Sequence, residues 1–258
     1  MYSSPSKAAT VRAAGDSQMR HVLYQLAQQG VTPLPGWHPA SRRVRRVLDR
    51  LLPFSGLEGE AWEVFVIPTA EQNAFVLPGG KVFVHAGILE VAGGDAGLAA
   101  VLGHEIAHNV ADHVGERMSA AVGTDVLLYG MMLVVGMVGF GPMLMHYFGG
   151  RLLEVAFGRP MSRVQEREAD YIGLMMMSEA CYDPREAVGF WERMMRRGGK
   201  EEPPEWLSTH PSNERRVEAM REWLPVAMEK RANSDCRTTA SFAEGFRRAL
   251  GRGVIVVY

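Results

Sequence analysis

Residues 97–118 read GLAAVLGHEIAHNVADHVGERM, and the small and apolar residues of this run predict a buried helix. His104 and His108 are four residues apart, so both imidazoles lie on one helix face and are able to bind one metal ion. Glu105 lies about 100° round the helix from His104, outside direct ligation but within reach of water at the metal. A surface helix with two ordinary histidines is the alternative, but it fits the apolar flanks poorly, because buried histidines and glutamates need partners. The H-E-x-x-H pattern therefore predicts a metal site with Glu105 as the general base.

The third metal ligand has two candidates in the sequence. Catalytic zinc sites usually combine three protein ligands with one water molecule. His113 follows His108 by five residues, where the metzincin pattern requires six, so we interpret it as the exposed or partly buried end of the helix. Glu166 is favoured, because Asp170 stands one turn further along the same predicted helix and is able to accept an imidazole N–H. We interpret Glu168 as facing solvent, and we expect one zinc ion (Zn2+) per chain.

The remaining pattern predicts an α+β fold, mainly helical, with a small antiparallel sheet next to the H-E-x-x-H helix. Pro78-Gly79-Gly80 separates two β-patterned segments and indicates a hairpin. The predicted strands cover 63–68, 74–77 and 81–85. The predicted helices cover about 17–29, 42–52, 88–92, 96–118, 162–179, 183–198 and 211–230, with Ser41 and Ser162 as expected N-caps. Residues before 17 are expected to be disordered, and 253–258 are expected to form a last strand.

Four motifs, in order along the chain, resemble those of one peptidase family. The H-E-x-x-H motif is followed by Ser162-Arg163 and by Glu166 to Asp170, a pattern similar to the gluzincin membrane-associated metallopeptidases, which include HtpX-type and CaaX prenyl proteases. Residues 73–84 (NAFVLPGGKVFV) and 205–212 (EWLSTHPS), with Arg216-Val217, are similar to the Oma-type mitochondrial inner-membrane metalloendopeptidases. We therefore divide the chain into a flexible segment with a short helix (1–40), a metallopeptidase domain (41–230) and a C-terminal tail (231–258).

The resemblance implies a zincin-like fold and a zinc metalloendopeptidase activity with definite residue roles. The implied roles are zinc binding by His104, His108 and Glu166, general-base catalysis by Glu105, ligand orientation by Asp170, and a place near the oxyanion for His210 with Arg216 supporting it. His210-Pro211 also fits a simple helix start. An extended substrate is expected to pair its backbone with the predicted strand residues Asn73, Ala74, Phe75 and Val76, with the strand 81–85 as the alternative.

The same resemblance implies partners and a location. The expected substrates are polypeptides that are membrane-anchored or misfolded, and contact with membrane lipid and self-association are expected as well. The implied location is the mitochondrial inner membrane, with the active site facing the intermembrane space and a role in protein quality control and the stress response. The alternative functions are a general HtpX-type quality-control peptidase of another membrane, and a zinc-stabilised chaperone or scaffold without turnover.

Composition excludes several other classes of protein. The 258 residues are 47% hydrophobic, which is enough to bury a sizeable core. The 28 basic and 29 acidic residues nearly cancel, so no strong field attracts nucleic acid and no such partner is expected. We interpret the arginines of 42–46 as a solvated helix face, with a phosphate or lipid-headgroup contact as the alternative. Cys181 and Cys236 are too few for a zinc ribbon, and unpaired thiols are favoured over a single disulfide.

Residues 126–150 contain no Asp, Glu, Lys or Arg and are long enough for one transmembrane helix. A single crossing would separate His108 from Glu166, and the run is too short for two full crossings. Pro142 predicts a break, so we expect a hairpin that faces a membrane, with an ordinary soluble core as the alternative. Members of the resembled family carry a transmembrane segment upstream, whereas residues 1–120 show neither such a segment nor a secretory signal.

Overall fold

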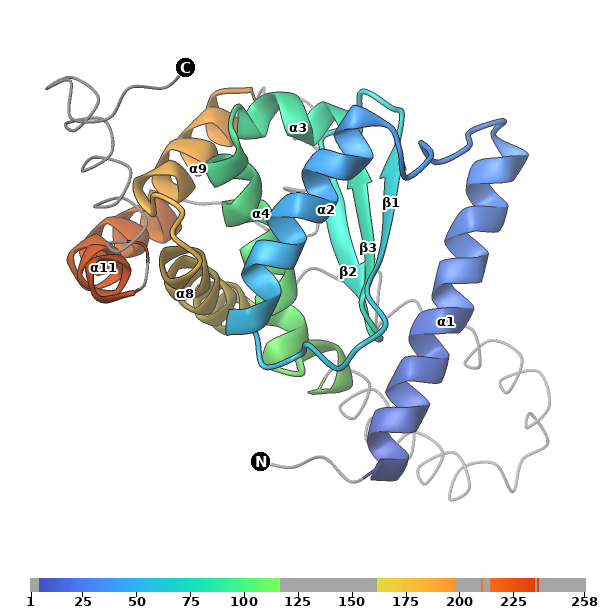
Figure 1. Cartoon of the computed structure of the whole chain (residues 1–258), viewed down its shortest axis with the longest axis horizontal. Coiled ribbons are helices and arrows are strands. Elements are labelled where there is room, and N and C mark those ends of the chain that lie inside the picture. Colours follow the sequence, from blue (N-terminus) through green and yellow to red (C-terminus); the bar gives the residue numbers. More distant parts are fainter. Residues whose placement is uncertain (1–4, 117–161, 198–209, 211–213, 235, 237–258) are drawn as a thin grey trace, which may run out of the picture.

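Three short strands lie between one long helix and a group of shorter helices (Figure 1). The computed structural model describes residues 5–116, 162–197, 210, 214–234 and 236. The elements are α1 (Pro5–Gln28), α2 (Pro39–Leu51), the 3-10 helix η1 (Leu52–Phe54), β1 (Glu63–Ile67), β2 (Ala74–Leu77), β3 (Lys81–His85), α3 (Ala86–Ala92), α4 (Asp95–Val110), α8 (Arg163–Glu179), α9 (Arg185–Arg197) and α11 (Glu214–Asn233). The predicted α+β class is confirmed.

The sheet has the strand order β1-β3-β2. β2 and β3 form the predicted antiparallel hairpin, and Gly79 and Gly80 at its turn have φ values of 78° and 77°, which favour glycine. β1 pairs with β3 in parallel, so the sheet is mixed rather than wholly antiparallel. The parallel pair arises because the chain leaves β1 for the far edge of the sheet, and the hairpin then returns β3 to the middle.

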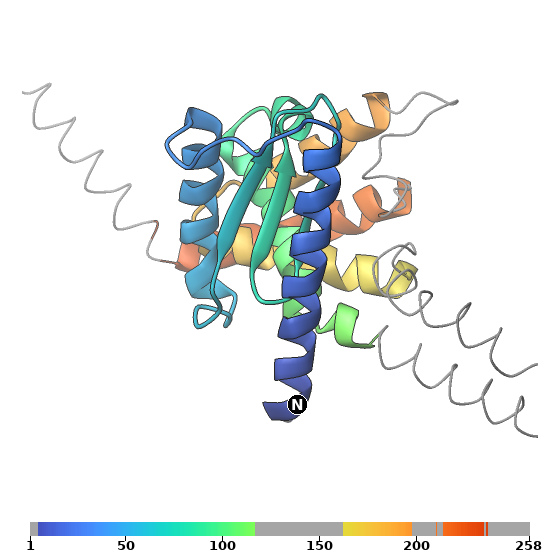
Figure 2. The same ribbon diagram turned by 90° about the vertical axis from the view of Figure 1, so that its right-hand side faces the viewer.

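Aromatic rings mark the sheet face that α1 covers. The rings of Phe65 and Phe75, on the two outer strands, each stack on Phe83 of the central strand, with centroids 4.8 and 4.9 Å away. Figure 2 shows α1 lying in front of this face, and Leu26 of α1 is buried against it. Side-chain packing across all three strands therefore holds the sheet to the first helix.

α1 begins at Pro5, well before residue 17, where the sequence predicts the helix to start. The alanines at 8–9 and 13–14 favour a helix, which explains the longer element. Gly15 permits close contact with the hairpin, because a Cβ atom there would lie 2.1 Å from the carbonyl oxygen of Pro78. Arg12 adds a 2.7 Å ion pair with Glu60. Contacts with the sheet thus order a segment whose sequence lacks a strong apolar period.

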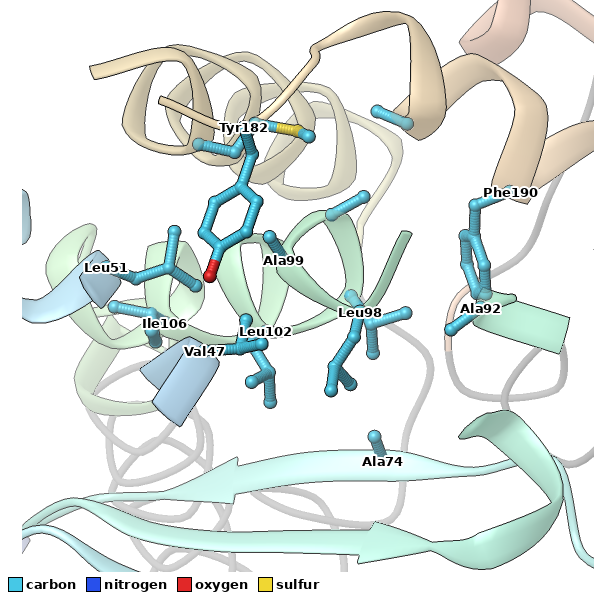
Figure 3. Close-up of a cluster of buried hydrophobic side chains, with 14 of the residues drawn as sticks. Val47, Leu51, Ala74, Ala92, Leu98, Ala99, Leu102, Ile106, Tyr182 and Phe190 are labelled. Atoms are coloured by element: carbon cyan, nitrogen blue, oxygen red, sulfur yellow. The ribbon is translucent and has the colours of Figure 1, made fainter. Parts of the chain in front are cut away.

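The other sheet face packs against α4 and α2. Figure 3 shows Leu98, Leu102 and Ile106 of α4 between Val47 of α2 and Ala74 of β2. All five side chains are essentially inaccessible to solvent. Full burial of a leucine or isoleucine side chain contributes about 1.5–3 kcal/mol. This core therefore fixes the position of the helix that carries the H-E-x-x-H motif.

Two arginines of α2 form ion pairs with the first turn of α4. The sequence predicts Ser41 as the N-cap, but the ring of His38 accepts the hydrogen bond from the first turn, and the helix starts earlier. Arg43 and Arg46 both bind Asp95, at 2.9 and 2.7 Å. These two guanidinium groups therefore hold α2 to the first turn of α4, where the negative charge of Asp95 also suits the helix dipole.

Cys181 and Cys236 form a disulfide, so the preference for unpaired thiols was wrong. Each cysteine follows the end of a helix, α8 or α11, and the two Cα atoms lie 5.4 Å apart. The two cysteines are 55 residues apart in the sequence, and no sequence pattern indicates that they lie close together.

The apolar run 126–150 and the predicted strand at 253–258 lie outside the described residues. No single helix within the described ranges has the length and apolar character to cross a membrane. The pair α3 and α4, bent by 120°, meets that criterion of length and composition only when the two are taken together.

Candidate metal centre

Two glycines let α4 and α8 cross in close contact. A Cβ atom on Gly173 would lie 2.8 Å from the backbone nitrogen of His104, and one on Gly103 would lie 3.1 Å from the carbonyl oxygen of Gly173. Ser162 is the N-cap of α8, as predicted, and it forms a capping box with Gln165 that fixes the first turn of the helix. Since His104 lies on α4 and Glu166 on that first turn, the crossing sets the distance between the predicted ligands.

The three predicted ligands meet at one point. The Nε2 atoms of His104 and His108 are 3.2 Å apart. Of the two carboxylate oxygens of Glu166, Oε2 lies 3.5 Å from Nε2 of His104 and Oε1 lies 3.5 Å from Nε2 of His108. Ligand atoms held tetrahedrally at 2.0–2.1 Å from one ion are about 3.3–3.4 Å apart, so these side chains fit a single ion. All three residues are buried. Two imidazoles and one carboxylate form a ligand set typical of catalytic zinc.

A buried carboxylate and a buried arginine support the ligands from outside. Asp170 Oδ1 lies 3.0 Å from Nδ1 of His104, a position from which it orients the ring. Arg216 donates two hydrogen bonds of 2.7 Å to Asp170 and reaches Glu166 Oε2 at 2.8 Å. Its guanidinium carbon lies 3.9 Å from the ring centroid of Trp191. One arginine therefore pairs with two buried carboxylates and rests on an aromatic ring.

His210 lies inside the cluster as well. Its Nδ1 is 2.9 Å from Glu166 Oε1 and 3.3 Å from Nε2 of His104. Four side chains, those of His104, His108, Glu166 and His210, thus place ligand atoms within 4.8 Å of one another. Nε2 of His210 is 3.4 Å from Oε1 of Glu105, which is also buried. The structure therefore brings the predicted general base beside the four-residue cluster, and it adds His210 as a fourth potential ligand.

Burial and ion pairing act in opposite directions on the titrating groups. Burial lowers the pKa of His104, but the contacts with Asp170 and Glu166 outweigh it and raise that pKa to about 9. Burial, together with positive charge on His104 and His210, lowers the pKa of His108 well below its usual value. Burial opposes ionisation of Glu166, yet the contacts with His104 and His210 hold its pKa well below the usual range. The cluster thus favours an ionised Glu166 and a neutral His108, the forms that bind a cation, whereas His104 must lose a proton before it binds one.

His113 lies deeper than the sequence suggests. It is 1% exposed, with Nδ1 2.8 Å from Nδ1 of His108 and Nε2 3.3 Å from Oε2 of Glu168. Glu168, predicted to face solvent, does so with half of its side chain and binds His113 with the carboxylate. α4 ends at Val110 rather than near 118, and Asp112, with φ 54°, turns the chain back. A continuous helix would instead carry His113 about 140° away from His108.

The edge strand β2 runs along the metal-binding helix. The carbonyl of Asn73 accepts a 2.9 Å hydrogen bond from His85 N, so the alternation of an antiparallel pair turns the backbone groups of Ala74 and Val76 to the other edge. Asn109, directly after the second histidine of the motif, donates from Nδ2 to the carbonyl of Val76 at 3.2 Å. The predicted substrate strand therefore lies beside the metal cluster.

The sequence profile of Peptidase family M48 matches residues 39–224. The chain belongs to this family. Mitochondrial metalloendopeptidase OMA1 of Schizosaccharomyces pombe is 43% identical over 212 residues, which cover 82% of this chain and 61% of that protein. Metalloendopeptidase OMA1, mitochondrial, of Homo sapiens is 36% identical over 205 residues, covering 75% and 39%. Beta-barrel assembly-enhancing protease of Escherichia coli is 25% identical over 220 residues, covering 82% and 44%.

Membership of family M48 confirms the family expected from the motifs. The chain spans between about two fifths and three fifths of the length of these three relatives. The sequence patterns did not reveal Trp191, whose ring lies beneath Arg216 and 5.9 Å from the ring of His104. In the sequence, an aromatic residue that lies beside a site on an amphipathic helix cannot be distinguished from one in the ordinary hydrophobic core.

Replacing Gly173 with alanine should weaken metal binding in this M48 site. The added Cβ would lie 2.8 Å from backbone atoms of α4, so the two helices must separate. Overpacking of this kind typically costs about 1–3 kcal/mol of unfolding free energy. Urea unfolding and zinc titration measure the two effects.

Gly189→Ala in α9 is the matched control for that substitution. Its Cβ would meet the ends of two side chains and no backbone, Arg193 at 3.0 Å and Glu186 at 3.9 Å, and alanine gains up to about 1 kcal/mol in helix propensity. Unchanged stability and zinc affinity in Gly173→Ala would mean that the helix crossing does not set the ligand geometry.

Proposed function

We propose that the chain is a zinc-dependent metalloendopeptidase that hydrolyses peptide bonds of membrane-associated or misfolded proteins. The observation that carries the proposal is the approach of two imidazole nitrogens and a carboxylate to within 3.5 Å of one another, with a buried glutamate alongside. Mixed nitrogen and oxygen ligands favour zinc over magnesium and calcium, which prefer oxygen alone.

Glu105 and His210 carry the proton transfers in this proposal. His104, His108 and Glu166 would hold a zinc ion, which would supply a Lewis acid for the scissile carbonyl and lower the pKa of a water molecule toward neutrality. Glu105 accepts a proton from the attacking water and later delivers it to the leaving amine. His210 donates a hydrogen bond to the oxyanion of the substrate as it develops. Burial strengthens both contacts, because little water competes for them.

The edge of β2 that faces away from β3 is the proposed place for an extended substrate. Ala74 and Val76 turn backbone groups toward that edge, and Asn109 occupies the carbonyl of Val76. Pairing with a substrate backbone reads main-chain geometry more than side chains. We therefore expect loose sequence specificity, with unfolding and access deciding which bonds are cut.

Location and partners follow from the relatives by analogy. The fungal and human relatives are named mitochondrial metalloendopeptidases. Cys181 and Cys236 form a disulfide. Disulfides are rare in cytosolic proteins, so this one suits a more oxidising compartment. We propose the mitochondrial inner membrane, with the active site facing the intermembrane space, membrane-anchored substrates, contact of residues 126–150 with lipid, self-association, and a role in protein quality control and stress.

Digestion of an unfolded protein tests the proposed activity. The purified chain should cleave casein, lose that activity in a metal chelator, and regain it when zinc is restored, because the proposed reaction needs the ion that His104, His108 and Glu166 would hold. Fragments are measured by gel electrophoresis and mass spectrometry. A protein that binds one zinc per chain and yet cleaves no unfolded substrate would support the chaperone or scaffold alternative instead.

A His210→Ala variant separates metal binding from hydrogen bonding to the oxyanion. We expect zinc affinity to change by less than about tenfold, while kcat/KM falls about 10²–10³-fold, the range for loss of one oxyanion donor. His108→Ala, which removes a predicted ligand, is the comparison and should lose zinc. Equal loss of zinc in both variants would make His210 a metal ligand rather than a hydrogen-bond donor.

A further inference from the structure

A buried histidine and a half-exposed glutamate lie in a line behind one of the predicted ligands. We propose that His113 and Glu168 are positioning residues that hold His108 in the tautomer and orientation needed to bind zinc. This inference rests on the proposed function, since it concerns the same metal site. Neither residue supplies an atom of the four-residue cluster. His113 contacts the ring of His108, and Glu168 contacts His113, so both act through that ring.

The positions of the ring nitrogens determine where the protons lie when metal is bound. Nε2 of His108 faces His104 and Glu166, at 3.2 and 3.5 Å, so this is the atom whose lone pair binds a cation. Its Nδ1 must then carry the proton and donate to Nδ1 of His113, 2.8 Å away. His113 in turn carries its proton on Nε2 and donates to the carboxylate of Glu168 at 3.3 Å. The contacts therefore form one directional chain that ends on a negative charge.

Through these two hydrogen bonds, His108 receives the support of a carboxylate, which His104 receives directly from Asp170. Asp170 lies 3.0 Å from Nδ1 of His104, whereas Glu168 reaches His108 only through His113. Both acids come from α8, which also supplies the ligand Glu166. Helix α8 thus contributes one metal ligand and two carboxylates that orient the other ligands. Carboxylates behind metal-binding histidines fix the tautomer and raise ligand basicity.

The backbone around His113 is built to return this residue to the site. Asp112 adopts the left-handed region, with φ 54°, immediately after α4 ends. Gly115 faces it so closely that an added Cβ would lie 2.2 Å from Asp112 Oδ1. Glu116 then accepts a 2.9 Å hydrogen bond from Gln165, which belongs to the N-terminal capping box of α8. The turn is therefore tied at one end to the metal-binding helix and at the other to the helix of Glu166.

Zinc affinity of two His113 variants tests the proposal without relying on activity. His113→Leu fills a similar volume but accepts no hydrogen bond, so we expect zinc affinity to fall about 10–100-fold. His113→Gln offers a carbonyl oxygen to His108 and an N–H to Glu168, and it should keep affinity within about threefold of wild type. Competition with a chromogenic zinc chelator measures both. Equal, wild-type affinity in the two variants would show that His113 only fills space.

Glu168→Gln provides a second variant at a half-exposed position, where folding is not at risk. We expect up to about a tenfold loss of zinc affinity, and no further loss when the same change is made in the His113→Leu background. Glu222→Gln, an exposed carboxylate of α11, is the matched control and should bind zinc as wild type does. Additive losses in the double variant would overturn the chain of contacts through His113.

Zinc titration of the wild-type protein distinguishes a failure of the proposed function from a failure of the positioning role. If wild-type protein binds no zinc, the proposed function fails and the positioning role fails with it. If wild type binds zinc tightly and Glu168→Gln binds it equally well, the metal site stands and the positioning role of this pair is wrong. Circular dichroism of the metal-free variants shows whether His113→Leu remains folded, and where it does not, Glu168→Gln decides.

Discussion

A Glu105→Gln variant should bind zinc as tightly as wild type and hydrolyse unfolded protein about 10³-fold more slowly. The glutamine keeps the size and most contacts of the buried side chain but cannot take a proton from water. General acid–base catalysis by one positioned group is worth about 10²–10⁴-fold, and here one residue serves both transfers. Zinc content after dialysis and initial rates of casein cleavage are the measurements.

The control for this variant is Glu90→Gln, which removes one carboxylate from an exposed side chain of α3. Its rate and zinc content should match those of wild type. Turnover within about tenfold of wild type in Glu105→Gln would remove Glu105 from the mechanism. Loss of zinc in the same variant would place its carboxylate among the ligands instead of beside them.

Helix periodicity predicts which ligand candidates share a helix face, whereas His210 and Arg216 were expected only from the family resemblance. The crossing of α4 and α8 then brings the two faces together. The pair His104 and His108 needs only a 3.6-residue repeat to share a face, and Glu166 and Asp170 need the same repeat on a second helix. Strand boundaries were also close to prediction, because Pro78 and the glycines after it interrupt two clear β-patterns. Features that depend on spacing within one element are readable from a single sequence.

Features that depend on contacts between distant segments were not readable in this way. His113 reaches His108 only because Asp112 adopts a positive φ, a conformation that no periodic pattern announces. Cys181 and Cys236 meet because two helices end side by side. The parallel pairing of β1 likewise depends on which strand occupies the middle of the sheet. Tertiary packing decides each of these cases, and local propensity does not distinguish the outcomes.

A Glu166→Ala variant should lose zinc and also lose the stability that zinc confers. The side chain is 2% exposed and supplies the only carboxylate within the four-residue cluster. Its removal leaves His104 and His108 as the predicted ligands that remain, with His210 beside them, so we expect zinc affinity to fall at least about 10³-fold. It also removes the carboxylate that pairs with the buried Arg216. Breaking a buried ion pair in this way typically costs about 3–5 kcal/mol of unfolding free energy. Metal analysis after dialysis and urea unfolding measure the two losses.

Unfolding with and without chelator separates the metal effect from the charge effect. Wild type should lose stability when the metal is removed, because a ligand that binds only the folded state stabilises it by mass action. Glu166→Ala should unfold at the same urea concentration in both conditions, since it holds no metal to remove. Glu166→Gln, which retains an oxygen acceptor for Arg216, keeps the comparison usable where the alanine variant fails to fold. One zinc ion per chain retained by either variant at wild-type affinity would exclude Glu166 as the third ligand, and the proposed hydrolysis would then need a different metal geometry.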